Sequence, residues 1–265
     1  LLEEAIKDRI AKTGKKPKAI IPVYLYGMPA RIDEIMEIAR RYEIPVLEDA
    51  AEGFGSKYKG RICGTFGDYG VMSFNGNKLI TPSGGGALIC PDEEAKKHVM
   101  FYATQAREAY PYYQHEQIGY NYRMSNICAG IGRGQMTIVG EHIEHHRWVH
   151  DYYKKKLRGY DDIVLQSAPE RYMESNYWLS TIRFEDNKHT IDGKLLPLIE
   201  RLSKMGIETR PLWKPMHLQP VYKDAPAYVS GVSEHLFSCG LCLPSGPYVG
   251  EREINYIVKS IVDNL

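Results

Sequence analysis

Two short apolar runs with a helical segment between them constrain the fold more than any other feature of this sequence. Residues 18–23 (KAIIPV) and 44–50 (IPVLEDA) have the length and composition of buried strands. Between them, residues 31–42 (RIDEIMEIARRY) repeat their apolar side chains at helical spacing. A strand, a helix and a strand in this order predict a βαβ unit, and therefore a parallel sheet with a right-handed crossover.

The ends of both predicted strands carry groups that can bind a ligand. Glu48 and Asp49 close the second run, while Tyr24, Tyr26 and Gly27 follow the first. In α/β sheets, ligands bind at the carboxyl ends of the strands. We therefore expect a binding site at this edge of the sheet.

One lysine lies in a glycine-rich connection between two further predicted strands, residues 69–74 (YGVMSF) and 86–90 (GALIC). Lys78 is followed by Leu79, whereas a Walker A loop requires Ser or Thr after its lysine, and most of the glycines here come after Lys78. No G-x-G-x-x-G follows the first predicted strand, so a Rossmann dinucleotide site is not supported either.

A lysine held between strands has another use, because a buried or cation-flanked amine is a nucleophile toward carbonyl groups. Enzymes that use pyridoxal 5'-phosphate (PLP) combine such a lysine with a phosphate-binding group and a carboxylate near the pyridine nitrogen. Ser73 and Asp49 can supply these groups from the ends of two predicted strands. The spacing alone leaves two interpretations of Lys78 open, a PLP-binding residue or a surface lysine in a turn.

A longer stretch around this lysine resembles a known family. Residues 48–89, from EDAAEGFGSKYKG to SFNGNKLITPSGGGALI, are similar to the core of the DegT-type sugar aminotransferases, which have the fold-type I PLP architecture. The similarity continues through residues 115–135, 207–222 and 240–246 and covers nearly the whole chain. It is closest to the subgroup that aminates C4 of UDP-4-keto-6-deoxy-N-acetylhexosamines, including the bacillosamine-type enzymes.

The resemblance implies an α/β fold with a mainly parallel sheet flanked by helices and a smaller C-terminal α+β domain. We expect residues 1–135 to form part of the large PLP-binding domain and residues 136–265 to form a connecting helix and the small domain. Family members are longer at the N-terminus. The resemblance therefore predicts that this chain lacks the first helices and strands, together with a phosphate-binding turn and a residue that stacks on the PLP ring.

The same resemblance assigns roles around the cofactor. Lys78 would bind PLP covalently through its amine, and Asp49 would pair with the pyridinium nitrogen. Glu52, where many relatives have glutamine, would lie near the 3-hydroxyl group of the ring, and Ser73 would bind the phosphate. Many relatives also have H-L-Y-G where this chain has residues 24–27 (YLYG), so a polar contact there is expected to differ.

Two more residues are assigned outside this group. Asn121, in GYNYRMS, would reach the phosphate of the cofactor in the neighbouring subunit, which implies a homodimer with shared active sites. His217, in WKPMH, would approach the sugar or cofactor from the small domain. Both lie in irregular, polar and aromatic segments of the kind that carry function in compact domains.

The resemblance implies transfer of an amino group from glutamate to a nucleotide sugar, for surface polysaccharide or glycan biosynthesis. Relatives that dehydrate sugars have histidine at the position of Lys78, so the lysine favours amination. Two alternatives stay open. One is a PLP-dependent sugar dehydratase, and the other is an inactive, truncated relative that acts as a binding or regulatory module.

Composition argues against several other classes of function. A net charge of +1 without blocks of like charge gives no reason to expect a nucleic-acid partner, and no apolar run approaches the roughly 20 residues of a membrane span. Five scattered cysteines fit a reducing compartment, so we expect a cytoplasmic protein. Cys239 and Cys242 form a lone C-x-x-C that is expected at a helix end running into a buried strand.

A group of histidines offers a possible metal site. His142, His145, His146 and His150 fall on one face of a predicted helix. No carboxylates are clearly spaced to support metal ligation beyond Glu141 and Glu144, which lie within the same helix. We therefore predict a solvated helix face or a subunit contact, and no metal.

Overall fold

The parallel pairing predicted from the two apolar runs is present in the computed structural model, which describes residues 1–265. The amide of Ile20 donates to Pro45 O and that of Asp49 donates to Pro22 O, both at 2.9 Å. Pro22 has no amide hydrogen to give to a ladder, so the first run pairs through isolated bridges instead of forming a regular strand. The predicted βαβ unit is therefore confirmed, with one irregular strand.

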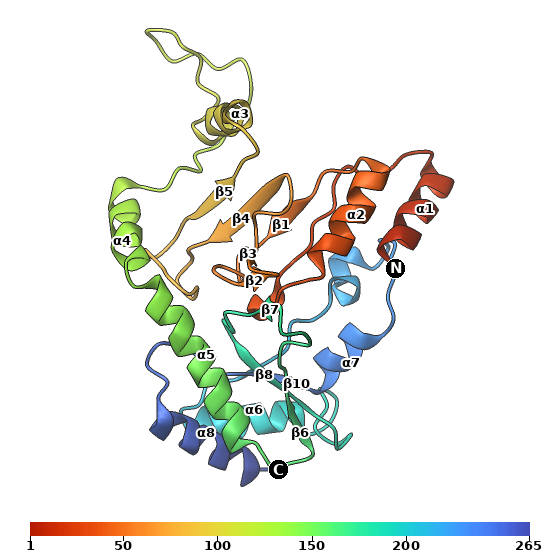
Figure 1. Ribbon diagram of the computed structural model, residues 1–265, viewed down its shortest axis with the longest axis vertical. Coiled ribbons are helices and arrows are strands. Elements are labelled where there is room, and N and C mark those ends of the chain that lie inside the picture. Colours follow the sequence, from red (N-terminus) through yellow and green to blue (C-terminus); the bar gives the residue numbers. More distant parts are fainter. The chain divides into compact units, whose positions relative to one another are not determined.

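This pairing continues into a three-stranded sheet in the order β1-β4-β5 (Figure 1). β1 (Leu47–Asp49) and β4 (Tyr69–Ser73) are parallel, with Asp49 opposite Val71. β5 (Gly86–Ile89) pairs antiparallel with β4, with Gly86 opposite Ser73. The connection between β4 and β5, which carries Lys78, therefore leaves the sheet at the carboxyl ends of β1 and β4.

The chain divides into two compact units. One consists of Lys18–His142 and Tyr172–Ser175, and the other of Leu1–Pro17, Ile143–Arg171 and Asn176–Leu265. Residues 1–17 thus group with the C-terminal part of the chain. The domains expected from the resemblance, 1–135 and 136–265, remain a proposal.

The Lys18–His142 unit surrounds the sheet with short helices and a second small sheet. The helix predicted over residues 31–42 forms α2 (Ile32–Tyr42). It buries Ile32 and Ala39, while its charged residues are exposed. Asp92 is the N-cap of α3 (Glu93–Ala103) and accepts a hydrogen bond from Ala95 N at 2.7 Å. The remaining elements are η1 (Leu25–Gly27), α2 (Ile32–Tyr42), β2 (Lys57–Tyr58), β3 (Arg61–Ile62), α3 (Glu93–Ala103), α4 (Asn126–Met136) and β7 (Met173–Glu174), with a sheet order of β3-β2-β7.

The other unit is built on a four-stranded antiparallel sheet in the order β6-β8-β10-β9. α6 (Leu195–Lys204) buries Leu195, Leu198 and Leu202 at helical spacing, and α8 (Glu251–Val262) buries Ile254 and Ile261. Its elements are α1 (Leu2–Thr13), α5 (Val139–Lys156, whose first turn belongs to the other unit), β6 (Ile163–Leu165), β8 (Ser180–Phe184), α6 (Leu195–Lys204), β9 (Arg210–Pro211), η2 (Met216–Leu218), η3 (Pro220–Tyr222), α7 (Val232–Cys239), β10 (Gly240–Leu243) and α8 (Glu251–Val262).

Cys239 and Cys242 lie where the sequence predicts them. Cys239 ends α7, and Cys242 lies in β10, all four residues of which are buried. Neither cysteine forms a disulfide bond. The C-x-x-C spacing therefore results from a helix that runs directly into a buried strand.

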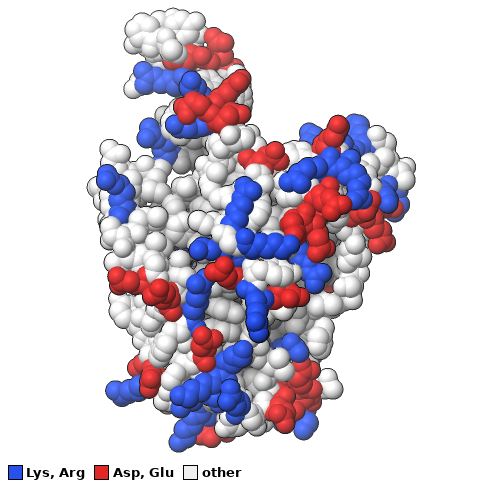
Figure 2. All heavy atoms as spheres, in the orientation of Figure 1, with Lys and Arg blue, Asp and Glu red and all other residues white.

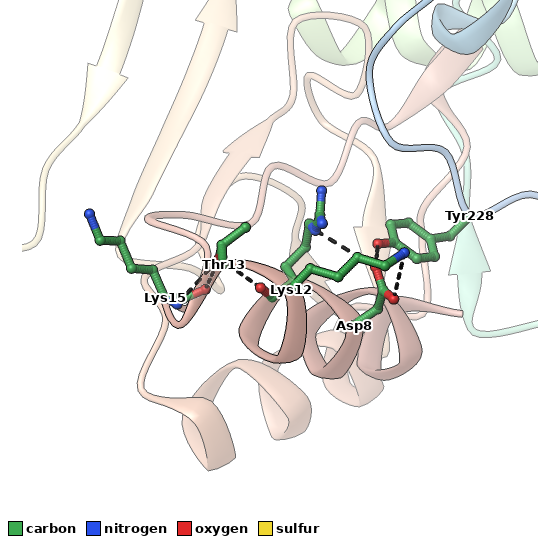
Figure 3. Close-up of polar contacts among 6 residues, drawn as sticks. Asp8, Lys12, Thr13, Lys15 and Tyr228 are labelled. Carbon is green, nitrogen blue, oxygen red and sulfur yellow. Dashed lines mark hydrogen bonds and ion pairs between the residues drawn. The ribbon is translucent and has the colours of Figure 1, made fainter.

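A polar contact ties the N-terminal helix to the segment before α7 (Figure 3). The hydroxyl of Tyr228 donates to Asp8, which also pairs with Lys12 at 2.9 Å. These interactions hold the pKa of Asp8 below its usual value, chiefly through the Tyr228 hydrogen bond. Together with the burial of Ile6, this contact explains why α1 groups with the C-terminal part of the chain.

A fully buried carboxylate connects three segments of the Lys18–His142 unit. Glu48, in β1, is 0% exposed and accepts hydrogen bonds from the hydroxyl of Tyr24 and from the amides of Gly64 and Gly67. The amide of Phe66 also donates to it. Because a buried charge is costly without such donors, this set of contacts fixes the 63–67 turn against β1.

Two of the four histidines on this face of α5 are buried, so the expectation of a solvated face is wrong for His146 and His150, while the alternative of a subunit contact stays a prediction. His146 is 5% exposed and His150 is 1% exposed, and the ring of His150 stacks on Tyr177 with centroids 3.6 Å apart. Burial and the neighbouring Lys154 charge lower the pKa of His150 to about 4. Helical spacing identified a shared face but not whether that face meets the core.

The surface charges are mixed, and the helices are short or polar. On the face shown in Figure 2, acidic and basic side chains are interspersed and form no extended surface of one sign. The helices of this chain are too short or too polar for any of them to cross a membrane.

The buried carboxylate generates a stability prediction. Glu48→Ala leaves several buried donors without an acceptor, so we expect the free energy of unfolding to fall by about 3–5 kcal/mol. Urea unfolding measures this change. In the control Glu37→Ala, which removes an exposed pair with Arg41, the change should stay within about 0.5 kcal/mol. A loss below about 1 kcal/mol for Glu48→Ala would contradict the role given to this carboxylate.

A second prediction concerns pH. The unfolded chain binds a proton at His150 near pH 6.5, whereas the folded protein does so only near pH 4, so this group removes stability as the pH falls through that window. Between pH 7.5 and 5.0, wild type should lose about 2 kcal/mol more than His150→Phe, whose ring can still stack on Tyr177. Equal losses of stability in wild type and His150→Phe would contradict this role of His150. The exposed His98, replaced by Gln, serves as control.

Candidate functional site

Lys78 lies beside a carboxylate in a partly enclosed position. Its Nζ is 3.5 Å from Glu52 Oε1, and both side chains are only 13% exposed. Leu79 and Ile80, which follow the lysine, are buried at 7% and 3% exposure. The alternative of a surface lysine in a turn does not fit this burial and pairing.

Glu52 is itself held by a turn with unusual backbone geometry. Its Oε2 accepts a hydrogen bond from the amide of Tyr26 at 2.7 Å. Tyr26 has φ 56°, in the left-handed region that a non-glycine residue adopts at a cost in energy. The next carbonyl, Gly27 O, accepts from the hydroxyls of Ser56 (2.7 Å) and Ser175 (3.0 Å). These two buried hydroxyls stabilise the turn that positions Glu52.

Asp49 and Ser73 lie at the carboxyl ends of two adjacent parallel strands. Asp49 closes β1 and Ser73 closes β4, and the two strands pair in register. One oxygen of Asp49 accepts from Ala51 N at 3.0 Å, and Ser73 Oγ accepts from Asn75 N at 3.3 Å. In this arrangement the hydroxyl hydrogen of Ser73 can be donated to a further group. Both residues thus share the sheet edge from which the Lys78 connection leaves.

Asn121 lies in the long loop between α3 and α4, which reaches away from the β1-β4-β5 sheet (Figure 1). Asn121 is exposed, forms an isolated bridge with Thr104, and lines a hollow of about 500 Å³ together with His115 and Gln117. Its assignment to the cofactor of a neighbouring subunit remains a prediction.

His217 belongs to the other unit. Its Nε2 is 2.7 Å from Glu234 Oε1, and it lines a hollow of about 320 Å³ with Met216 and Tyr222. The carboxylate fixes which ring nitrogen carries a proton, because only an N–H can donate to it. The role of His217 toward a sugar or cofactor remains a prediction.

The residues at the sheet edge fit PLP by their chemistry. A lysine amine, a strand-end carboxylate and a serine hydroxyl are the groups that this cofactor requires for its aldehyde, pyridine nitrogen and phosphate. The structure brings Lys78 and Glu52 into contact and places Asp49 and Ser73 on the same edge. No cluster of three or more His, Cys, Asp or Glu side chains is arranged to hold a metal ion.

Sequence reasoning missed three contacts, one to Glu52 and two to the connection that carries Lys78. The amide of Tyr26 holds Glu52, while Gln135 Oε1 accepts from Thr81 N at 2.5 Å and His142 Nδ1 donates to Leu79 O at 3.0 Å. The last two partners are 54 and 63 residues apart in sequence. Neither spacing nor periodicity marks contacts at such separations.

Comparison with known proteins agrees with this geometry. EpsN of Bacillus subtilis (strain 168), described as a putative pyridoxal phosphate-dependent aminotransferase, is 43% identical over 98% of this chain and 66% of its own length. GDP-perosamine synthase of Escherichia coli O157:H7 is 35% identical over 97% of this chain and 68% of its own. The chain thus spans about two thirds of the length of these relatives.

A solved structure shows the same architecture. The crystal structure of a DegT DnrJ EryC1 StrS aminotransferase from Brucella abortus superposes with a TM-score of 0.85 at 30% identity, over 99% of this chain and 68% of that one. Residues 1–262 match the sequence model of one family. The α/β fold of fold type I is therefore confirmed, and the chain belongs to the DegT/DnrJ/EryC1/StrS aminotransferase family.

Proposed function

We propose that this protein is a PLP-dependent aminotransferase that moves an amino group from glutamate to C4 of a UDP-linked 4-keto-6-deoxy-N-acetylhexosamine. The observation that carries the proposal is the partly enclosed Lys78 beside Glu52 at the sheet edge that also holds Asp49 and Ser73. Family membership supports the reaction class. The finer substrate rests on the resemblance of the motifs, while the similarity to a GDP-perosamine synthase keeps a GDP-linked sugar as the alternative.

The side chains of the site have distinct tasks in this proposal. Bound PLP would supply an electron sink that stabilises negative charge at the carbon that loses a proton. Lys78 Nζ would bind the cofactor covalently and, when released by the donor, carry the proton to and from the donor's α-carbon as general base and acid. Asp49 would keep the pyridine nitrogen protonated, and Ser73 Oγ would donate to the phosphate.

Glu52 and its turn would orient the lysine. The carboxylate holds the Nζ of Lys78 at 3.5 Å and is fixed in turn by the Tyr26 amide. Near the ring's 3-hydroxyl, the same carboxylate would accept a hydrogen bond from the cofactor. Precise orientation matters because a misplacement of about 1 Å can cost about 10²-fold in rate.

We also propose that the active form is a homodimer in which Asn121 of one subunit reaches the cofactor of the other. Apolar side chains around Asn121 support this, since Tyr113, Ile118, Tyr122 and Ile127 are between 76% and 84% exposed. α3, α4 and β5 contain no buried residue. Exposed apolar side chains gathered in one segment are typical of an interaction site. The cytoplasmic location remains a prediction from the cysteine content.

The reaction is tested with the natural polypeptide that carries this sequence, PLP, glutamate and either UDP- or GDP-linked 4-keto-6-deoxy sugars. We expect 2-oxoglutarate and the 4-amino sugar nucleotide in equal amounts, with the UDP substrate preferred. A deoxygenated sugar without amine transfer would indicate the dehydratase. Cofactor binding without any turnover would indicate a binding module, and either result would overturn the proposal.

Lys78→Ala removes the amine that binds the cofactor. We expect the visible absorption band that wild type forms with PLP to disappear and amine transfer to fall by about 10²–10⁴-fold or more. Absorption spectra and the product assay measure both effects. Lys97→Ala, at an exposed position of α3, is the matched control and should behave like wild type. A band that persists in Lys78→Ala rules out the covalent role.

Glu52 can be tested by a graded pair of variants. Glu52→Gln keeps an oxygen to accept from Tyr26 N and a polar group beside Lys78, so turnover should stay within about tenfold of wild type. Glu52→Ala releases both contacts and should lower kcat by about 10²-fold through misplacement of the lysine. Steady-state kinetics distinguish the two, and equal effects of Gln and Ala would exclude a positioning role.

A further inference from the structure

The backbone around Lys78 is fixed by two side chains that arrive from a distant part of the sequence. The lysine loop, residues 74–85, connects β4 to β5. We propose that Gln135 and His142 are positioning residues that hold this loop so that Lys78 lies beside Glu52. The consequence for catalysis rests on the proposed function, but the contacts themselves concern the chain alone.

Hydrogen bonds within the lysine loop shape its base and the turn before Lys78. Phe74 N donates to Gly85 O at 3.0 Å, and Thr81 Oγ1 donates to Phe74 O at 3.0 Å. Lys78 N donates to Asn75 O in a short turn at 3.0 Å. These bonds shape the loop but do not connect it to another element of the unit.

Gln135, near the end of α4, supplies such a connection. Its Oε1 accepts from the amide of Thr81 at 2.5 Å, three residues after Lys78. Because the amide oxygen of glutamine can only accept, the side chain has one orientation in this contact. Gln135 is partly buried, whereas its neighbour Met136 is 46% exposed.

His142, in the first turn of α5, makes the second connection. Its Nδ1 lies 3.0 Å from Leu79 O, and a carbonyl oxygen only accepts, so Nδ1 carries the proton. Leu79 is the residue directly after Lys78 and its side chain is 7% exposed. His142 thus belongs to the histidine face noted in the sequence, and its contact gives that residue a function other than metal binding.

Both contacts hold the backbone that follows the lysine, at Leu79 and Thr81, one and three residues after Lys78. A lysine side chain has several rotatable bonds, so the position of its amine depends on how well its backbone is fixed. Loss of either contact would allow the loop to move away from Glu52 and expose the amine. This is the effect that a test must detect.

The test measures how fast an amine-directed acylating reagent labels Lys78 in the cofactor-free protein, by peptide mass spectrometry. We expect Gln135→Leu and His142→Leu to increase labelling of Lys78 by about threefold or more, without a general increase at other lysines. Gln135→Glu keeps the acceptor oxygen, and His142→Asn keeps a donor near the place of Nδ1, so both should label nearly as slowly as wild type. Glu141→Gln, at an exposed neighbour, is the control.

Labelling of Lys78 at the wild-type rate in folded leucine variants would overturn the proposal, as would equal labelling in the leucine and the conservative variants. If a leucine variant does not fold, hydrogen exchange of the Thr81 amide in wild type decides. Slow exchange supports the Gln135 contact, and exchange at the rate of an open peptide overturns it. No PLP is present, so the result is independent of whether the aminotransferase proposal holds.

Discussion

The buried carboxylate of Glu48 is the interaction on which the arrangement of the site depends. It accepts from Tyr24 on one side and from the amides of the 63–67 turn on the other, and it is wholly excluded from solvent. A buried charge is tolerated only when hydrogen bonds offset the cost of removing it from water. The residue after it is Asp49, so the same strand that holds this network also presents the candidate partner of the cofactor's ring nitrogen.

A short series of contacts connects Glu48 to Lys78. Tyr24 precedes the turn in which Tyr26 adopts a left-handed conformation, and the Tyr26 amide holds Glu52. Strain of this kind persists where the surrounding contacts over-determine it, and here the serine hydroxyls on Gly27 O do so. The lysine loop meets Glu52 from the other side, fixed by contacts from α4 and α5. The site therefore forms where two local turns meet, and side chains from distant parts of the sequence hold these turns in place.

Sequence reasoning found the parts of this arrangement that have local signals. Apolar runs and helical spacing identified the βαβ unit, and strand ends then located Asp49 and Ser73 on one edge with Lys78 in the adjoining connection. The hydrogen bonds that Glu48 accepts from several segments could not be predicted, because some of its donors are backbone amides whose direction depends on the turn they form. The two-residue strands β2, β3 and β7 are too short for periodicity to mark. Burial of His146 and His150 depends on what packs against α5, which spacing alone does not specify.

The central claim is that Lys78 is the residue that binds PLP covalently. The most direct measurement is reduction of the PLP-loaded protein with borohydride, followed by proteolysis and mass spectrometry to locate the added pyridoxyl group. The account predicts one modification per chain, on the peptide that contains Lys78. A modification at another lysine, or none in protein that has taken up PLP, would contradict it.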